Sequence, residues 1–176
     1  CEPWRQLVGR DRTALLADLR RAYSLLFVRQ GDGVAVWPYE SAYLHAKAGR
    51  QGEPALFRSA VTLDVEHMMS EAGGLPPDAR VEPCDSVWHE FMFLSYLLGS
   101  EAEALDAGDG DAAALARSRA EAFVEGHASR WLPGFFGSVE RELPALVQPQ
   151  DGSHLFYEGL CSYGMQALDL ISSHLT

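Results

Sequence analysis

Apolar residues recur at steps of three and four along most of the chain, which is the spacing of an amphipathic helix. The first clear stretch follows Asp11, a residue type that caps helix N-termini. Its apolar positions include Leu15, Leu19 and Leu26, and the pattern ends at about Val28. This spacing predicts a helix that presents one apolar face to a core.

The pattern stops between residues 29 and 53. Glycine and aspartate at residues 31–33 predict a turn, because glycine tolerates backbone conformations that other residues avoid. The apolar run at residues 34–37 is the candidate strand, although no second strand is apparent for it to pair with. Pro38 follows at once, so the segment is expected to continue as a loop.

Two further helices are expected in the middle of the chain. The first has Pro54 in its first turn, where the missing N–H costs nothing, and stops at Gly73 and Gly74. The second follows Asp85, a candidate N-cap. Its predicted apolar stripe consists of Val87, Phe91, Leu94 and Leu98, widened by Trp88 and Met92. A helix that is apolar on several sides belongs at the centre of a bundle.

The last third of the chain predicts three more helices. Asp111 ends a polar connector and is expected to cap the first of them. Residues 131–136 open a short helix that Pro144 and Pro149 end, and Ser153 is expected to cap the last one. The chain of 176 residues therefore predicts an all-α, single-domain bundle of about six helices.

Charge and cysteine content narrow the classes of partner. The formal net charge of −11 argues against nucleic acids and anionic membrane surfaces, which bind through lysine and arginine, and suits a cationic partner. No apolar run approaches the roughly 20 residues that a membrane-spanning helix needs. Cys1, Cys84 and Cys161 form no CxxC pair, which favours a reducing compartment, and we expect a cytoplasmic protein.

No set of residues in the sequence predicts catalysis. There is no phosphate-binding loop with glycines and a lysine, and no serine in a GxSxG turn. His89 and Glu90 resemble the start of a zinc-protease motif, but Phe93 stands where the second histidine is needed. Cys84 has no basic neighbour in sequence and is expected to be inert. We therefore expect no catalytic residues, no metal site and no cofactor.

Two carboxylates precede the most apolar helix, and two interpretations of them remain open. Glu82 and Asp85 could cap this helix and complement its dipole. Alternatively, they could form a negative rim beside an apolar groove, where carboxylates bind the arginines of a peptide.

Four stretches in order resemble the TorD/DmsD family of molybdoenzyme maturation chaperones, which includes NarJ-like proteins. They are residues 22–28 (AYSLLFV), 38–43 (PYESAY), 82–92 (EPCDSVWHEFM) and 127–135 (HASRWLPGF). The third and fourth are the more specific at this spacing. One departure is that Ser86 stands where the family usually has histidine. The family also has more helix before the first motif, so N-terminal helices are expected to be missing from this sequence.

The resemblance implies a helical chaperone that is not an enzyme. It would bind the twin-arginine signal peptide and the catalytic subunit of a molybdopterin-containing oxidoreductase during cofactor insertion, before export. The residues that the resemblance assigns to peptide contact are Tyr23, Leu26, Phe27, Pro38, Tyr39, Glu40, Ser41, Glu82, Asp85 and Ser86. His127 and Trp131 are expected to hold the bundle together instead.

Two alternatives stay open beside this hypothesis. A NarJ-like chaperone would recognise a nitrate reductase that is not exported. A helical GTP hydrolase is the second alternative. Apart from the protein partners, the only ligand that the resemblance leaves open is a weakly bound guanine nucleotide. Both a monomer and a domain-swapped dimer are compatible with the resemblance.

Overall fold

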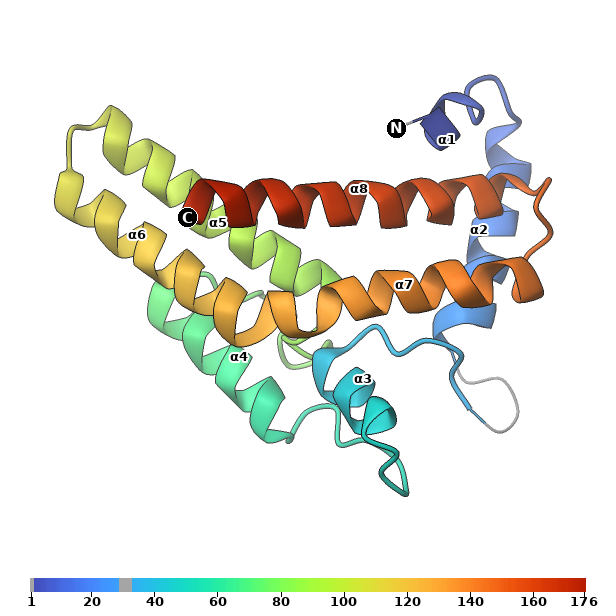
Figure 1. Ribbon diagram of the computed structural model, residues 1–176, viewed down its shortest axis with the longest axis horizontal. Coiled ribbons are helices and arrows are strands. Elements are labelled where there is room, and N and C mark those ends of the chain that lie inside the picture. The colour runs from blue at the N-terminus through green and yellow to red at the C-terminus, as the bar shows by residue number, and fades with distance from the viewer. Residues whose placement is uncertain (1, 29–32) are drawn as a thin grey trace. The chain divides into compact units, whose positions relative to one another are not determined.

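The computed structural model describes residues 2–28 and 33–176, and the described residues are all-α (Figure 1). The elements are α1 (Glu2–Arg5), α2 (Arg12–Phe27), α3 (Glu40–Lys47), α4 (Ala60–Ala72), α5 (Val87–Asp106), α6 (Gly110–Phe123), the π-helical segment η1 (Val124–Ala128), α7 (Ser129–Leu146) and α8 (Gly152–Leu175). The six predicted helices correspond to α2 and to α4 through α8, so the predicted fold class is confirmed. The short helices α1 and α3 were not predicted.

The chain forms two compact units, and each is described here by itself. Unit 1 contains Cys1–Trp37 and Pro133–Leu170, and unit 2 contains Pro38–Leu132 and Ile171–Thr176. The divisions therefore fall within α7 and near the end of α8. None of the helices in the described part of the chain is both long enough and apolar enough to cross a membrane.

Unit 1 is built on α2, most of α7 and most of α8. Its larger buried apolar residues are Leu26, Phe135, Phe136, Val139, Leu143, Tyr157, Cys161 and Leu168. The two long helices approach closely at Gly164, where a Cβ atom would lie 2.2 Å from the Phe136 ring. Trp4 fits against Gly159 in the same way, and its Nε1 donates to the Phe156 carbonyl at 2.9 Å.

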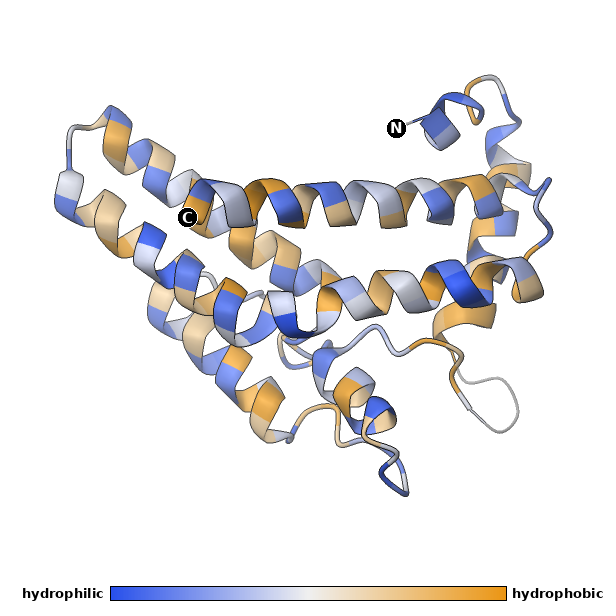
Figure 2. Ribbon diagram, in the orientation of Figure 1, coloured by the Kyte–Doolittle hydropathy of each residue, from blue (hydrophilic) through white to orange (hydrophobic). Residues whose placement is uncertain are grey.

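In unit 2, α5 and α6 form an antiparallel helical hairpin, and apolar and polar residues alternate around both helices (Figure 2). Its larger buried apolar residues are Val65, Met69, Phe93, Leu94, Leu97, Phe123 and Trp131. The α6 residues that are buried beside them are mostly alanines, including Ala116 and Ala120, and small side chains permit close helix packing.

The segment between α2 and α4 differs from its prediction. Residues 34–37 are not a strand, and an isolated β-bridge joins Tyr39 to Ser86. Val36 is instead buried and donates its N–H to the Leu26 carbonyl at 2.9 Å. Two residues of the predicted turn, 31 and 32, lie outside the described residues.

Four predicted helix starts were wrong. The helix that was expected to include Pro54 begins at Ala60, because the Ser59 hydroxyl caps it by accepting the Thr62 N–H at 2.9 Å. Ser86 caps α5 in place of Asp85, and Asp109 caps α6 in place of Asp111. Ser153 does not cap α8 but lies inside it, where its hydroxyl is buried without a hydrogen-bond partner.

The predicted break before residue 131 is also wrong. The π-helical turn η1 continues α6 and leads directly into α7, so no new helix opens there. Pro133 and Pro144 both lie inside α7, which ends at Leu146. A helix can continue past a proline when the loss of one backbone hydrogen bond is offset by packing.

The buried face of α5 differs from the predicted apolar stripe. It consists of His89, Glu90, Phe93, Leu94, Leu97 and Glu101, whereas Met92 is exposed. Leu94 of the predicted stripe is buried, and Val87, Phe91 and Leu98 are half-buried. Three of the six buried side chains are ionisable, so apolar periodicity alone could not identify them.

Candidate functional site

The beginnings of α3 and α5 are joined by main-chain hydrogen bonds in unit 2. The Glu40 N–H donates to the Asp85 carbonyl at 2.8 Å, and the Val87 N–H donates to the Pro38 carbonyl at 3.0 Å. Together with the bridge between Tyr39 and Ser86, these bonds place the second and third stretches of the family resemblance side by side.

Asp85 caps a helix, but not the helix that follows it in sequence. Its carboxylate accepts the backbone N–H of Ser41 at 2.8 Å, in the first turn of α3. The N-cap residue of α3, Tyr39, makes no side-chain capping bond, so Asp85 supplies that bond from 44 positions away. Burial raises the pKa of Asp85, and its hydrogen bonds to Ser41 and Thr62 partly oppose this shift.

Glu40 is fully buried and pairs with a buried histidine. His127 Nδ1 lies 2.7 Å from Glu40 Oε2, and His127 Nε2 lies 3.4 Å from the exposed carboxylate of Asp64. The other Glu40 oxygen, Oε1, is buried without a hydrogen-bond partner. This contact joins the start of α3 to η1, and it confirms that His127 holds elements of the bundle together.

Glu90 on α5 is also fully buried, and its partner is an indole. Trp131 Nε1 donates to both carboxyl oxygens, at 3.1 and 2.9 Å. Burial raises the pKa of Glu90 well above its usual range, and the negative charge of Glu40 raises it further. Trp131 is completely buried, in agreement with its predicted structural role.

We refer to these linked side chains as the buried polar node, which consists of Glu40, Ser41, Asp85, Glu90, His127 and Trp131. Three residues assigned to peptide contact, Glu40, Ser41 and Asp85, belong to it. Pro38 and Ser86 are buried next to it. Residues far apart in sequence meet here, and their polar groups are used mainly to hold α3, α5, η1 and α7 together.

A half-buried aromatic pair lies beside the node. Tyr39 and Trp88 are both partly exposed, and their ring centroids are 6.0 Å apart in an edge-on arrangement. Trp88 was not among the predicted site residues, although the third stretch of the resemblance includes it. Glu82, in the loop before α5, is half-buried, and its Oε1 has no hydrogen-bond partner.

The other three predicted contact residues lie in unit 1 on α2. Tyr23 is 41% exposed and meets Phe27, four residues further along α2, edge-on at 5.3 Å. Phe27 is half-buried and stacks on Phe135 at 6.0 Å. Leu26 is fully buried, so its side chain serves the core.

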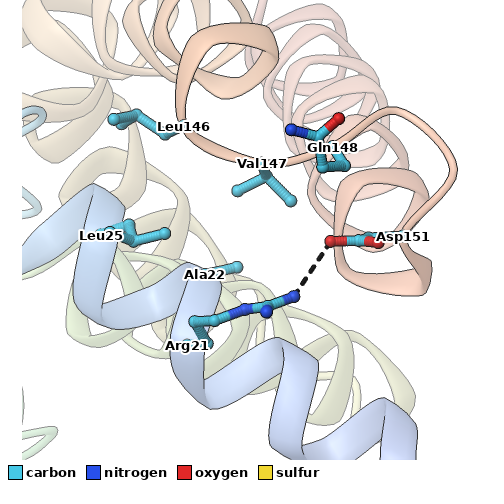
Figure 3. A pocket seen from close by; sticks show the side chains of 7 residues that line it. All are labelled: Arg21, Ala22, Leu25, Leu146, Val147, Gln148 and Asp151. Carbon is cyan, nitrogen blue, oxygen red and sulfur yellow. Dashed lines mark hydrogen bonds and ion pairs between the residues drawn. The ribbon is translucent and has the colours of Figure 1, made fainter.

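A small pocket of about 340 Å³ also lies in unit 1, between α2 and the segment that joins α7 to α8 (Figure 3). Its apolar part is formed by Ala22, Leu25, Leu146 and Val147. Figure 3 shows Arg21 reaching across to Asp151, at a distance of 3.0 Å. Sequence reasoning did not identify this pocket, because its walls are contributed by separate parts of the chain.

The described cysteines are buried free thiols. Burial raises the pKa of Cys84 to about 11 and that of Cys161 to about 12, so both stay protonated at neutral pH. Across residues 2–28 and 33–176, no three histidine, cysteine or acidic side chains are grouped in a way that could hold a metal ion.

Comparison with known proteins assigns the family. The sequence model of the nitrate reductase delta subunit family matches residues 1–137, which include every predicted contact residue and the whole buried polar node. Neither the curated proteins nor the solved structures gave a significant match. The chain therefore belongs to the nitrate reductase delta subunit family, whose members are chaperones for the maturation of molybdoenzymes.

Proposed function

We propose that this protein binds the N-terminal segment of a molybdoenzyme catalytic subunit and holds it while the cofactor is inserted. The observation that carries the proposal is the family match over residues 1–137. The segment we favour is a twin-arginine signal peptide, and the encounter would take place in the cytoplasm before export.

The exposure of the candidate residues divides them into two roles. Tyr23, Phe27 and Tyr39 have aromatic surface that a peptide can reach, and burying such side chains supplies most of the affinity in peptide recognition. Glu82 is half-buried, so part of its side chain is accessible although its Oε1 is buried, and a carboxylate is the group that pairs with an arginine. We assign Tyr39 and Glu82, which both lie in unit 2, to peptide contact, and separately Tyr23 and Phe27, which both lie in unit 1.

The buried members of the predicted set act differently in this proposal. Glu40 and Asp85 have no exposed surface, and each is bonded within unit 2. Their part is to fix the start of α3 and so the position of Tyr39. Loss of either would weaken peptide binding indirectly, through movement of Tyr39.

A second candidate function is favoured by the name of the matched family. A nitrate reductase delta subunit suggests a client that is itself a nitrate reductase, and that client need not carry an export signal. The two candidates differ in the peptide that is recognised, so one experiment can compare them.

The test is titration calorimetry of the purified chain with synthetic N-terminal peptides from molybdoenzyme catalytic subunits of the same organism. Controls replace the paired arginines by lysine or interrupt the apolar stretch with charged residues. Binding of a twin-arginine peptide that both controls weaken would support the first candidate. Binding only of an N-terminus without paired arginines would support the second. No binding to any peptide would contradict both.

A further inference from the structure

An apolar stripe on α5 is exposed to solvent in unit 2. Trp88, Met92 and Tyr96 follow one another at four-residue intervals, which places them along one side of the helix. Met92 is 58% exposed and Tyr96 is 43% exposed, while Trp88 is half-buried. We refer to these three residues as the α5 stripe. The neighbouring face of the helix carries Glu90 and Phe93 into the core.

Tyr96 is fixed at one end of the stripe. Its hydroxyl donates to the Ala72 carbonyl at the end of α4 at 2.9 Å, and its ring stacks on Phe93 at 6.4 Å. Gly74 lies directly against the ring, where a Cβ atom would be 2.8 Å from Tyr96 Cδ1. An exposed aromatic ring that is already held in place loses little conformational entropy on binding a partner.

Trp88 is fixed at the other end by its contact with Tyr39, and Tyr39 is held in turn by the main-chain bridge to Ser86. Met92 lies between the two aromatic residues. An unbranched, polarisable side chain adapts to different apolar partners, so the stripe combines two ordered anchors with one adaptable position.

The stripe lies in the most acidic part of the chain. Residues 60–106 contain ten carboxyl groups and one arginine, a formal net charge of −9 out of −11 for the whole chain. Three of these carboxyl groups, on Asp85, Glu90 and Glu101, are buried, and the other seven have exposed surface. Asp78 is exposed and lies 3.3 Å from His89, the residue after Trp88. Glu71 is exposed and precedes Ala72, which accepts the Tyr96 hydroxyl. Carboxylates therefore flank both ends of the stripe.

We propose that the α5 stripe is a docking surface for the client's N-terminal segment, with the apolar residues of that segment against Trp88, Met92 and Tyr96. Its basic residues would pair with the flanking carboxylates. This inference rests on the proposed function and adds a surface that the family resemblance does not assign to peptide contact. Charge complementarity selects this occupant, because the apolar stripe is surrounded by negative charge and the segment is both basic and apolar.

The test compares two variants with the same change of charge. Met92→Lys alters the centre of the stripe, and Leu105→Lys alters an equally exposed apolar residue on α5, at 60% exposure, about 20 Å further along the helix. The probe is a synthetic peptide with paired arginines followed by an apolar stretch. We expect Met92→Lys to weaken peptide binding about tenfold or more, and Leu105→Lys to change it less than about twofold.

Thermal melting by circular dichroism checks that both variants fold like the parent, as expected for exposed positions. If the parent binds the peptide and the two variants bind it equally well, the α5 stripe is not the docking surface, while the proposed function stands. If the parent itself does not bind the peptide, the twin-arginine candidate and this inference both fail. A selective loss in Met92→Lys supports the inference.

Discussion

Two sides of α5 carry very different chemistry. On one side, Glu90 is sealed in the core and bonded to Trp131, and the buried polar node continues from it to α3 and η1. On another side, Trp88 and Met92 face solvent within acidic surroundings. The buried carboxyl groups of the family motifs, on Glu40, Asp85 and Glu90, therefore form hydrogen bonds inside the protein. Trp88 and Met92, which are apolar residues of the same motif as Glu90, keep accessible surface.

The largest expected difference between the two sides is in the stability of tryptophan variants. Trp131→Ala removes a completely buried indole and leaves Glu90 without its donor, so we expect a loss of about 3–5 kcal/mol in the free energy of unfolding. Trp88→Ala should cost about 1 kcal/mol, because its side chain is only half-buried. Urea unfolding followed by circular dichroism measures both. Equal losses would contradict the distinction.

The second prediction concerns pH. Because the pKa of Glu90 in the folded state lies well above 4.5, the unfolded chain releases this proton first. The free energy of unfolding should therefore fall as pH rises above about 4.5, by at most about 1.4 kcal/mol per pH unit, until the folded carboxyl titrates. Glu90→Gln, which keeps an acceptor for Trp131, should make the profile flatter and raise stability at neutral pH.

Glu101→Gln on the same helix is the matched control for this measurement. The hydrogen bond from His174 lowers the pKa of Glu101, so this carboxylate stabilises the fold above its unfolded pKa and loses that effect as pH falls. Its replacement should therefore reduce stability at neutral pH. If both variants shifted the profile in the same direction, the contrast between a sealed and a paired carboxyl would be wrong.

The smallest expected difference in stability is between alanine variants of the neighbouring capping residues Asp85 and Ser86. Asp85→Ala should destabilise the protein by about 1–2 kcal/mol and speed amide hydrogen exchange in the first turn of α3, because the Ser41 N–H loses its acceptor. Ser86→Ala should cost less, since its capping bond to His89 is longer at 3.3 Å, and should speed exchange at the start of α5. Faster exchange in α5 for Asp85→Ala would contradict the assignment.

The helices could be predicted because their signals are local. Apolar spacing predicted α2 and the five long helices after α3. Asp11 was correctly identified as a cap, because its carboxylate accepts the N–H of Ala14, only three residues further along the chain. Other caps were displaced by one or two positions where capping residue types stand close together, as Asp109 and Asp111 do. Helix α3 went undetected because it is short and its capping carboxylate comes from Asp85.

The sequence predicted which residues belong to the candidate site, but not which of them are buried. The resemblance selected Tyr39, Glu40 and Asp85, and the structure brings them together. Their burial could not be predicted, because it depends on whether side chains such as His127 and Trp131 arrive opposite them. Trp88 was treated as part of the core, since an aromatic residue on an apolar helix is usually buried.

The sequence by itself determined the helical class, the family and the concentration of negative charge, because periodicity, motif order and composition are properties of the chain alone. Tertiary structure decided which polar residues are sealed inside and which apolar residues face solvent. The physical reason is that a buried carboxylate is tolerated only with partners of suitable geometry, and those partners lie tens of residues away. Asp85 and Glu90 have such partners in Ser41 and Trp131, whereas Met92, on the same helix as Glu90, is exposed at the surface.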